Sequence, residues 1–148
     1  ERVGAQGKVL ACDIQSTVTV FPPNVEFHQE DVFQRSEAFE RQLAETGPFH
    51  VVMSDMAPQT TGTKFTDQAR SLELCLEALA VAEKYLVKGG SFVVKIFMGP
   101  DVGELLKGMR PRFARVTSFK PQSSRVESKE TFFVGLGFKG KEADGARD

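Results

Sequence analysis

One lysine lies inside an apolar run, where burial disfavours a charge. Lys95 occurs in Ser91-Phe-Val-Val-Lys-Ile-Phe97, a composition that predicts a buried strand. Burying an unpaired ammonium group costs on the order of several kcal/mol, and desolvation favours the neutral amine, the form that acts as a general base. The alternative is that Lys95 lies at a strand terminus and extends its charged end into water.

Two carboxylates occur at the boundaries of other apolar runs. Asp55 closes the run Val51-Val-Met-Ser-Asp55, and Glu130 precedes the apolar run that starts at Thr131. A lysine with carboxylates at neighbouring strand ends indicates a site for proton abstraction, because the acids can orient the amine while it accepts a proton. We therefore expect Lys95, Asp55 and Glu130 to form the catalytic site.

Short apolar runs alternate with longer helical patterns along the chain, which predicts an α/β fold with a mostly parallel sheet. The predicted strands are Lys8 to Cys12, Val25 to His28, His50 to Ser54, Ser91 to Ile96, Ala114 to Phe119 and Thr131 to Phe138. The predicted helices are Ser36 to Glu45, Asp67 to Val87 and one that begins near Asp101. The second helix is expected to bury the apolar residues Leu72, Leu76, Leu79, Ala80 and Leu86.

Capping residues and linker lengths refine this outline. Asp67 is expected to cap the start of the long helix, and Gly89-Gly90 to end it. Asp101 and Glu104 have the spacing of a capping box. The segment from Lys120 to Lys129 is too short for a crossover helix, so the last two strands should pair antiparallel.

Length and composition limit the class of protein. With 148 residues and 41% hydrophobic content, the chain suffices for one domain, expected over residues 1–140 with a polar tail at 141–148. No apolar stretch approaches the roughly 18 residues that span a bilayer, and the first residues lack a signal peptide's apolar segment, so we expect no membrane partner and a cytoplasmic location. Cys12 and Cys75 are widely separated, which predicts two reduced core thiols and no metal site.

The charge is unevenly distributed. Residues 1–83 contain six Lys or Arg and thirteen Asp or Glu, a balance of −7, whereas residues 84–141 contain twelve and four, a balance of +8. This asymmetry indicates a face that attracts a polyanion, although solvated basic side chains would give the same count. Lys120, Arg125 and Lys129 lie in a hydroxyl-rich segment suited to phosphate contacts.

Two further aspartates follow predicted strands. Asp13 ends the first strand, where a carboxylate can accept hydrogen bonds from ribose hydroxyls, and Asp31 follows the second, in a position suited to an adenine amino group. Either could instead form a turn or cap a helix. A nucleotide-binding unit usually opens with a strand, a Gly-rich turn and a helix, and the residues before Lys8 are too few to supply these.

Three segments together resemble the FtsJ/RrmJ family of ribose 2′-O-methyltransferases: Val51-Val-Met-Ser-Asp-Met-Ala-Pro58, Gly89-Gly-Ser-Phe-Val-Val-Lys-Ile-Phe97 and Lys120-Pro-Gln-Ser-Ser-Arg-Val-Glu-Ser-Lys-Glu130. The resemblance runs from about Gly4 to Gly140 and is strongest to the bacterial enzymes that methylate a uridine of large-subunit (23S) ribosomal RNA. It implies a Rossmann-like fold, S-adenosyl-L-methionine as cofactor, and ribosomal RNA or the large ribosomal subunit as partner.

The resemblance also assigns residue roles. The family uses a Lys-Asp-Lys-Glu tetrad, and Asp55, Lys95 and Glu130 match its last three members. Asp13, Asp31 and Asp55 match carboxylates that line its cofactor site.

The first tetrad lysine and a Gly-Trp cofactor loop have no counterpart in this chain, so the resemblance implies that they lie upstream of Glu1 together with the central first strand. The strands at Lys8 to Cys12 and His50 to Ser54 should then not pair directly. Two alternatives remain open, a methyltransferase with another acceptor and a non-catalytic RNA-binding or ribosome-assembly module.

Overall fold

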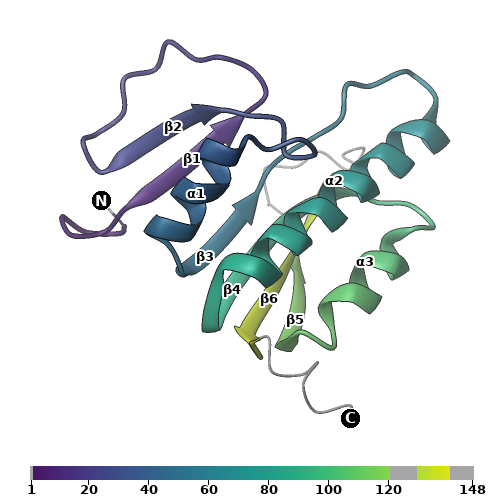
Figure 1. Ribbon diagram of the computed structural model, residues 1–148. Helices are drawn as coiled ribbons and strands as arrows, with labels where there is room; N and C mark the ends of the chain where they lie inside the picture. The colour runs from purple at the N-terminus through teal and green to yellow at the C-terminus, as the bar shows by residue number, and fades with distance from the viewer. Residues whose placement is uncertain (1, 121–129, 141–148) are drawn as a thin grey trace. The chain divides into compact units, whose positions relative to one another are not determined.

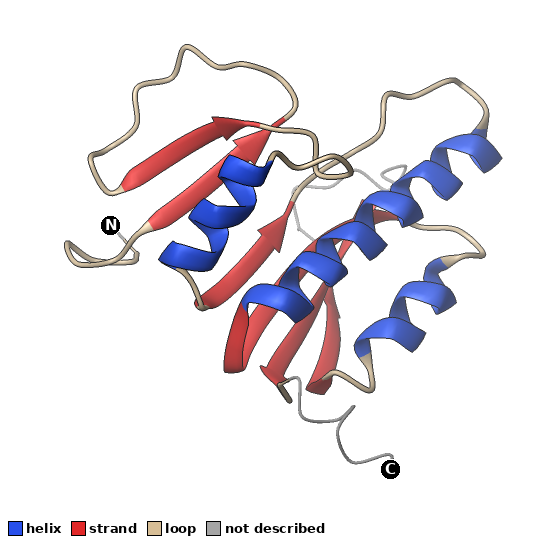
Figure 2. Cartoon of the chain, viewed as in Figure 1, coloured by secondary structure: helices blue, strands red, loops and turns tan. Residues whose placement is uncertain are grey.

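The computed structural model describes residues 2–120 and 130–140. The chain divides into two compact units, Glu1–Pro48 and Phe49–Asp148. Figure 1 labels the elements of both units, and Figure 2 distinguishes their helices from their strands.

The first unit contains two parallel strands and one helix. β1 (Val9–Asp13) pairs with β2 (Val25–Gln29) from Val9↔Val25 to Asp13↔Gln29. α1 (Glu37–Thr46) begins after Ser36, whose Oγ accepts a hydrogen bond from the Phe39 N–H at 3.2 Å, so the hydroxyl satisfies a backbone donor that the first helical turn leaves unpaired. Buried Phe39 attaches the helix to β2, with its ring 5.1 Å from that of His28.

The second unit is a four-stranded sheet with two helices on one face (Figures 1 and 2). The strand order is β3-β4-β6-β5, with β3 parallel to β4 and β6 antiparallel to both of its neighbours. Strands β3, β4 and β5 therefore run in one direction and β6 in the opposite one, which confirms the predicted α/β fold and the antiparallel pairing of the last two strands. The elements are β3 (Phe49–Ser54), α2 (Lys64–Tyr85), β4 (Leu86–Phe97), α3 (Val102–Met109), β5 (Phe113–Phe119) and β6 (Glu130–Phe138).

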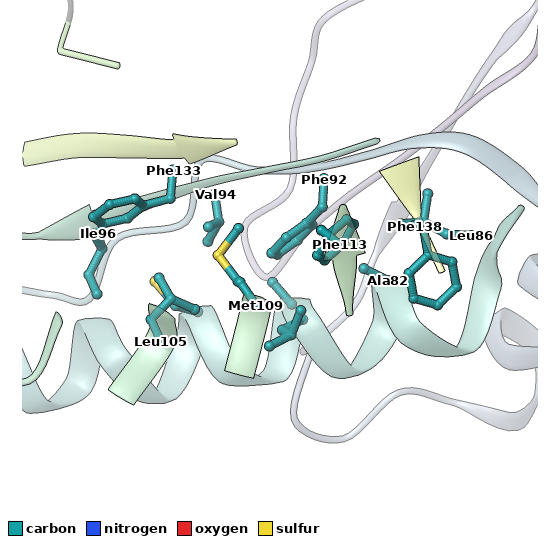
Figure 3. Packing of buried hydrophobic residues seen from close by; sticks show 13 residues of the cluster. Ala82, Leu86, Phe92, Val94, Ile96, Leu105, Met109, Phe113, Phe133 and Phe138 are labelled. Carbon is teal, nitrogen blue, oxygen red and sulfur yellow. The ribbon is translucent and has the colours of Figure 1, made fainter. Parts of the chain in front are cut away.

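The core of the second unit lies between the sheet and the two helices (Figure 3). Side chains alternate between the two faces of a strand, so β4 directs Phe92, Val94 and Ile96 into this core, where none is more than 1% exposed. Leu105 and Met109 of α3 meet them from the helix layer and are fully buried. Burying each such side chain contributes roughly 1.5–3 kcal/mol relative to leaving it in water.

A glycine in β6 makes room for an aromatic ring from β5. A Cβ atom built on Gly135 would lie 2.7 Å from the ring of Phe113, closer than real Cβ contacts allow. The Phe113 ring therefore packs directly over the β6 backbone. It also stacks with Phe92, at 6.1 Å between ring centroids, so β5 is tied into the same core.

The junction between α2 and β4 differs from the prediction. The helix ends at Tyr85 and β4 begins at Leu86, so the predicted terminator Gly89-Gly90 lies inside the strand. Gly89 has φ +86°, which a residue with a side chain rarely adopts, and the pairing of β3 with β4 shifts register between Phe49 and Val51. The glycines therefore accommodate an irregular strand start, a role that local turn preferences did not distinguish from a helix stop.

The caps predicted for α2 and α3 are also wrong. Helix α2 begins three residues before Asp67, and the Asp67 carboxylate accepts hydrogen bonds from the backbone N–H and the hydroxyl of Thr61, both at 2.8 Å. Asp101 precedes α3 as predicted, but its side chain makes no capping bond, so no capping box forms with Glu104.

The buried face of α2 was predicted only in part, although Leu72 does pack against the core. Leu79 and Leu86 are buried as predicted, but Leu76 is 40% exposed and Ala80 is exposed. Small and polar residues share the buried face with Leu79 and Tyr85. The buried residues of the helix are Asp67, Gln68, Ser71, Cys75, Ala78, Leu79, Ala82 and Tyr85.

The two cysteines differ in environment. Cys75 is buried in the core as predicted, whereas Cys12 is exposed, so the prediction of a core thiol at Cys12 is wrong. β1 belongs to the two-stranded sheet of the first unit and β3 to the four-stranded sheet of the second. The helices of that part of the chain include none long and apolar enough to span a bilayer.

Candidate active site

Strand alternation places Lys95 on the face of the sheet opposite the helices. Its neighbours Val94 and Ile96 point into the core, so the Lys95 side chain must point the other way. The side chain is only 13% exposed, which confirms that the lysine is largely withdrawn from water. The alternative of a lysine extending freely into solvent is therefore wrong, because the amine is paired with both predicted carboxylates.

Asp55 reaches Lys95 because β3 and β4 are parallel neighbours. Their pairing ends at Ser54↔Val94. Asp55 directly follows the paired part of β3, and Lys95 directly follows the paired part of β4. Lys95 Nζ lies 3.0 Å from Asp55 Oδ1, a distance typical of a charge-assisted hydrogen bond. The carboxylate itself is 79% exposed, so it connects the withdrawn amine to the open carboxyl end of the sheet.

Glu130 approaches the amine from the other flank. β6 pairs with β4 through Lys95↔Phe132 and Phe97↔Glu130, so Glu130 is the diagonal neighbour of Lys95 on the same face. Its Oε1 lies 3.9 Å from Lys95 Nζ, which is an ion pair but too long for a hydrogen bond. The structure thus brings together all three predicted catalytic residues, with Asp55 as the close partner of the amine and Glu130 as the distant one.

Helix α2 fixes the backbone of the strand end that carries Lys95. Cys75 Sγ donates to the Lys95 carbonyl at 3.0 Å, and Ser71 Oγ accepts from the Phe97 N–H at 3.0 Å. One turn further, Gln68 Nε2 donates to the Met98 carbonyl at 2.8 Å. The pairing with β3 stops at Val94, so these side chains satisfy backbone groups beyond the point where that strand ends.

This set of contacts was missed in the sequence. The signal was available as three hydrogen-bonding residues at positions 68, 71 and 75 of one helix, a spacing that places them on one face. Burial raises the pKa of the Cys75 thiol to about 12, so the group stays protonated and keeps its donor. These contacts hold the Lys95 backbone in place and leave its side chain to meet the carboxylates.

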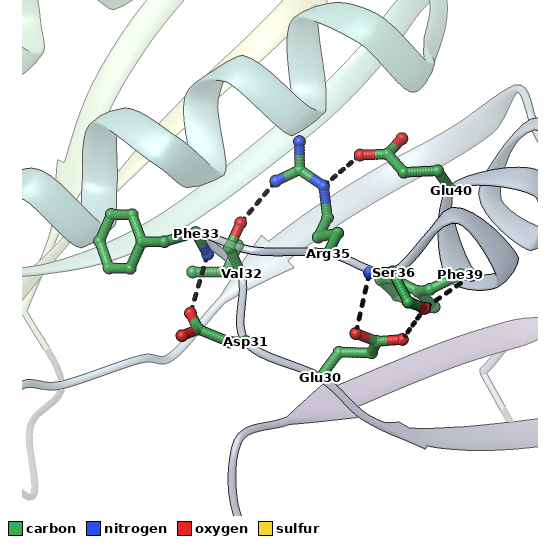
Figure 4. Close-up of polar contacts among 8 residues, drawn as sticks. All are labelled: Glu30, Asp31, Val32, Phe33, Arg35, Ser36, Phe39 and Glu40. Carbon is green, nitrogen blue, oxygen red and sulfur yellow. Dashed lines mark hydrogen bonds and ion pairs between the residues drawn. The ribbon is translucent and has the colours of Figure 1, made fainter.

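The two other predicted aspartates lie in the first unit. Asp13 ends β1, and its Oδ1 accepts from the Gln15 N–H at 3.0 Å. Asp31 follows β2, and its Oδ1 accepts from the Phe33 N–H at 2.9 Å (Figure 4). Each aspartate therefore stabilises a local turn, which the sequence had left open as an alternative to ligand binding. In the described part of the chain the contacts use one carboxylate oxygen of each, so a second oxygen remains for a ligand.

Ser36 and Glu30 complete the loop after β2. The Ser36 N–H and Oγ both bond to the Glu30 carboxylate, while Arg35 pairs with Glu40 and donates to the Val32 carbonyl at 2.7 Å (Figure 4). These bonds give the backbone around Asp31 a defined conformation. Among residues 2–120 and 130–140, no group of three His, Cys, Asp or Glu side chains could hold a metal ion.

A lysine held between two carboxylates at the carboxyl end of an α/β sheet is consistent with the class of Rossmann-like group-transfer enzymes. The family model described as FtsJ-like methyltransferase matches residues 1–138. The chain therefore belongs to the FtsJ-like methyltransferase family.

Individual relatives agree with this assignment. A protein of Nitratidesulfovibrio vulgaris named ribosomal RNA large subunit methyltransferase E is 72% identical over 148 residues, which cover 100% of this chain and 72% of the relative. A Lawsonia intracellularis protein of the same name is 64% identical over 139 residues, covering 94% and 70% of the two chains.

A solved structure shows the same fold. A Plasmodium falciparum protein described as a ribosomal RNA methyltransferase superposes with a TM-score of 0.75 over 90% of this chain and 74% of that one, at 24% identity. At that identity the likeness concerns the fold alone.

Proposed function

We propose that this protein transfers a methyl group from S-adenosyl-L-methionine to a ribose 2′-hydroxyl, in a uridine of large-subunit ribosomal RNA. The observation that carries the proposal is the position of Lys95, an amine largely withdrawn from water and 3.0 Å from the Asp55 carboxylate. The names of the relatives at 72% and 64% identity support the choice of ribosomal RNA as substrate.

The chemistry asks two things of the protein. A ribose hydroxyl is a weak nucleophile, so its oxygen must be held in line with the methyl group and its proton removed as the new bond forms. S-Adenosyl-L-methionine, when bound, supplies a methyl group activated by a sulfonium charge. Everything else must come from side chains at the carboxyl edge of the sheet.

Lys95 is the proposed general base. To act as the base, the ion-paired ammonium of Lys95 must first lose a proton, and the amine then accepts the 2′-hydroxyl proton. Backbone bonds from Cys75 to Lys95 and from Phe97 to Ser71 limit how far this strand end can move. Asp55 orients the amine through the 3.0 Å contact, and Glu130, at 3.9 Å, is free to turn toward either the amine or the ribose. Positioning of this kind is worth several orders of magnitude in rate.

The carboxylates also fit the cofactor. Asp55 is 79% exposed, so it can face a cationic ligand while it holds Lys95. We propose that Asp55 contacts the cofactor, and that Asp13 and Asp31 use their second carboxylate oxygens for its ribose hydroxyls and adenine amino group. Titrating the cofactor into the variants Asp13→Asn and Asp31→Asn by calorimetry tests each residue separately, and unchanged affinity would restrict that residue to its turn.

The proposed reaction has a direct chemical test. The enzyme, produced at the full length of its relatives, is incubated with methyl-labelled S-adenosyl-L-methionine and fragments of 23S ribosomal RNA. A 2′-O-methyl group removes the nucleophile of alkaline cleavage, so the modified position should resist hydrolysis and appear as a gap in the ladder. An RNA with a 2′-deoxyribose at that position is the matched control and should accept no methyl group. Label in a base, or in the deoxy control, would point to another acceptor, and no incorporation into any RNA would favour a non-catalytic role.

A further inference from the structure

We propose that Phe119 is a stacking platform for a nucleobase of the RNA substrate, at the acceptor nucleotide or directly beside it. This inference rests on the proposed function, because it assigns the RNA a position relative to Lys95. It concerns how the substrate is held and not the transfer step.

The sheet register places Phe119 in line with the proposed base. Phe119 of β5 pairs with Phe132 of β6, and Phe132 pairs with Lys95 of β4. Directly paired residues of a sheet project their side chains on the same face. Lys95, Phe132 and Phe119 therefore form one row across three strands, on the face that also carries Glu130.

The exposure of Phe119 separates it from the other aromatic residues of the sheet. Its side chain is 58% exposed, whereas Phe92, Phe113, Phe133 and Phe138 are all buried on the helix-covered face. A single exposed aromatic residue is common on protein surfaces and needs no explanation by itself. What distinguishes Phe119 is that it shares a row with Lys95 and a face of the sheet with Glu130.

The spacing suits one nucleotide. Neighbouring strands lie about 4.8 Å apart, so the backbones at Lys95 and Phe119 are separated by roughly 10 Å across the sheet. A base lying flat on the Phe119 ring would place its sugar over Phe132 and toward the amine. Single-stranded RNA is commonly held this way, with unstacked bases on aromatic rings.

The occupant should be an aromatic base and not an anion. The face offers the exposed ring of Phe119 beside the half-buried Phe132, and it carries the carboxylates Asp55 and Glu130 around the amine. These acids disfavour a phosphate directly over the row. A ring surface beside carboxylates accommodates the flat, uncharged part of a nucleotide. The phosphates would then be contacted elsewhere.

The test compares Phe119→Leu, which keeps apolar area but loses the ring, with Phe119→Tyr, which keeps the ring. Both are made in the full-length enzyme, and the dissociation constant for an oligoribonucleotide is measured across a range of salt concentrations. Stacking on an aromatic side chain is worth about tenfold or more in affinity per base. We expect Phe119→Leu to weaken RNA binding by about that factor and Phe119→Tyr to restore it to within about twofold.

Salt dependence separates stacking from the loss of a charge. A ring that contacts no phosphate releases no counterion, so Phe119→Leu should shift the dissociation constant at every salt concentration without changing the slope. Leu136→Ala is the matched control, because Leu136 is exposed on the same face of β6 but four residues further from the site. It should leave RNA affinity unchanged.

The possible outcomes are distinct. Unchanged RNA affinity in Phe119→Leu, or failure of Phe119→Tyr to restore it, would overturn the stacking proposal even if the wild-type enzyme methylates RNA normally. Loss in Phe119→Leu with recovery in Phe119→Tyr would support it. The experiment measures binding, so it tests the stacking proposal whether or not the wild-type enzyme methylates ribose. Absence of ribose methylation by the wild-type enzyme would count against the proposed function alone.

Discussion

Lys95 Nζ and Asp55 Oδ1 lie 3.0 Å apart although the amine is 13% exposed and the carboxylate 79% exposed. The pair joins a withdrawn amine to a solvent-facing acid across two parallel strands whose pairing ends one residue earlier. The acid can therefore contact a ligand on its exposed side while it holds the amine on the other.

Replacing Asp55 by Asn keeps the shape of the side chain and removes its charge. We expect turnover to fall by about two orders of magnitude, since the amine loses its orienting partner, and cofactor affinity to fall by about tenfold. Single-turnover methylation and calorimetry measure the two effects. Asp101→Asn is the control, since the Asp101 side chain makes no capping bond, and it should change neither. Intact cofactor affinity in Asp55→Asn would confine Asp55 to the chemical step.

Ser71→Ala removes the acceptor for the Phe97 N–H. Ser71 is 1% exposed, so the N–H would be left unpaired out of water, at a cost of about 1–3 kcal/mol in the free energy of unfolding. Urea unfolding measures this loss. Ser118→Ala, at an exposed position of β5, should stay within about 0.5 kcal/mol of wild type. Equal effects of the two substitutions would show that the Ser71 hydrogen bond contributes nothing particular to stability.

Asp67 should make stability depend on acid. The Thr61 backbone N–H and hydroxyl hold the pKa of the Asp67 carboxyl below its usual range. A lowered folded-state pKa contributes stability that is fully present above the unfolded-state value, about 4, and is lost as pH falls through the folded-state value. The difference in unfolding free energy between wild type and Asp67→Asn should be constant near neutral pH and shrink below about pH 4. A difference that does not vary with pH would contradict this.

The sequence predicts which residues form this site better than it predicts how they pair across the sheet. The apolar run around Lys95, with Asp55 closing one other run and Glu130 opening another, was enough to predict that the three residues come together. The ends of the parallel strands β3 and β4 meet at one edge of the sheet, and the antiparallel strand β6 begins at that same edge. Register could not be predicted in the same way. That Asp55 is adjacent in register and Glu130 diagonal depends on which residues of β3, β4 and β6 pair.

The errors have a common cause. Gly89-Gly90, Asp67 and the α2 face were each interpreted from local preference, and in each case tertiary contacts decided the outcome. The spacing of Gln68, Ser71 and Cys75 shows that they share one helix face, but it does not show which backbone groups of the strand they bond. Exposure of Cys12 likewise could not be inferred from residue type.

The basic second half of the chain predicts salt-sensitive RNA binding. Lys120 is exposed at the end of β5, and Arg125 and Lys129 lie outside the described residues. Reversing all three charges should weaken RNA binding and reduce the slope of log affinity against log salt by up to about three, roughly one for each phosphate that is no longer neutralised. Circular dichroism should show an intact fold. Unchanged affinity and slope would mean that these charges are only solvated.

The most direct test of the proposed mechanism is the rate of methyl transfer by Lys95→Arg. Arginine keeps a positive charge beside Asp55 but does not give up its proton, so it cannot act as a base. Lys95→Arg and Lys95→Ala, in the full-length enzyme, should both lose about two orders of magnitude or more in single-turnover rate while cofactor affinity stays near wild type. A near-wild-type rate in Lys95→Arg would show that Lys95 acts by charge alone, and would contradict its assignment as the general base.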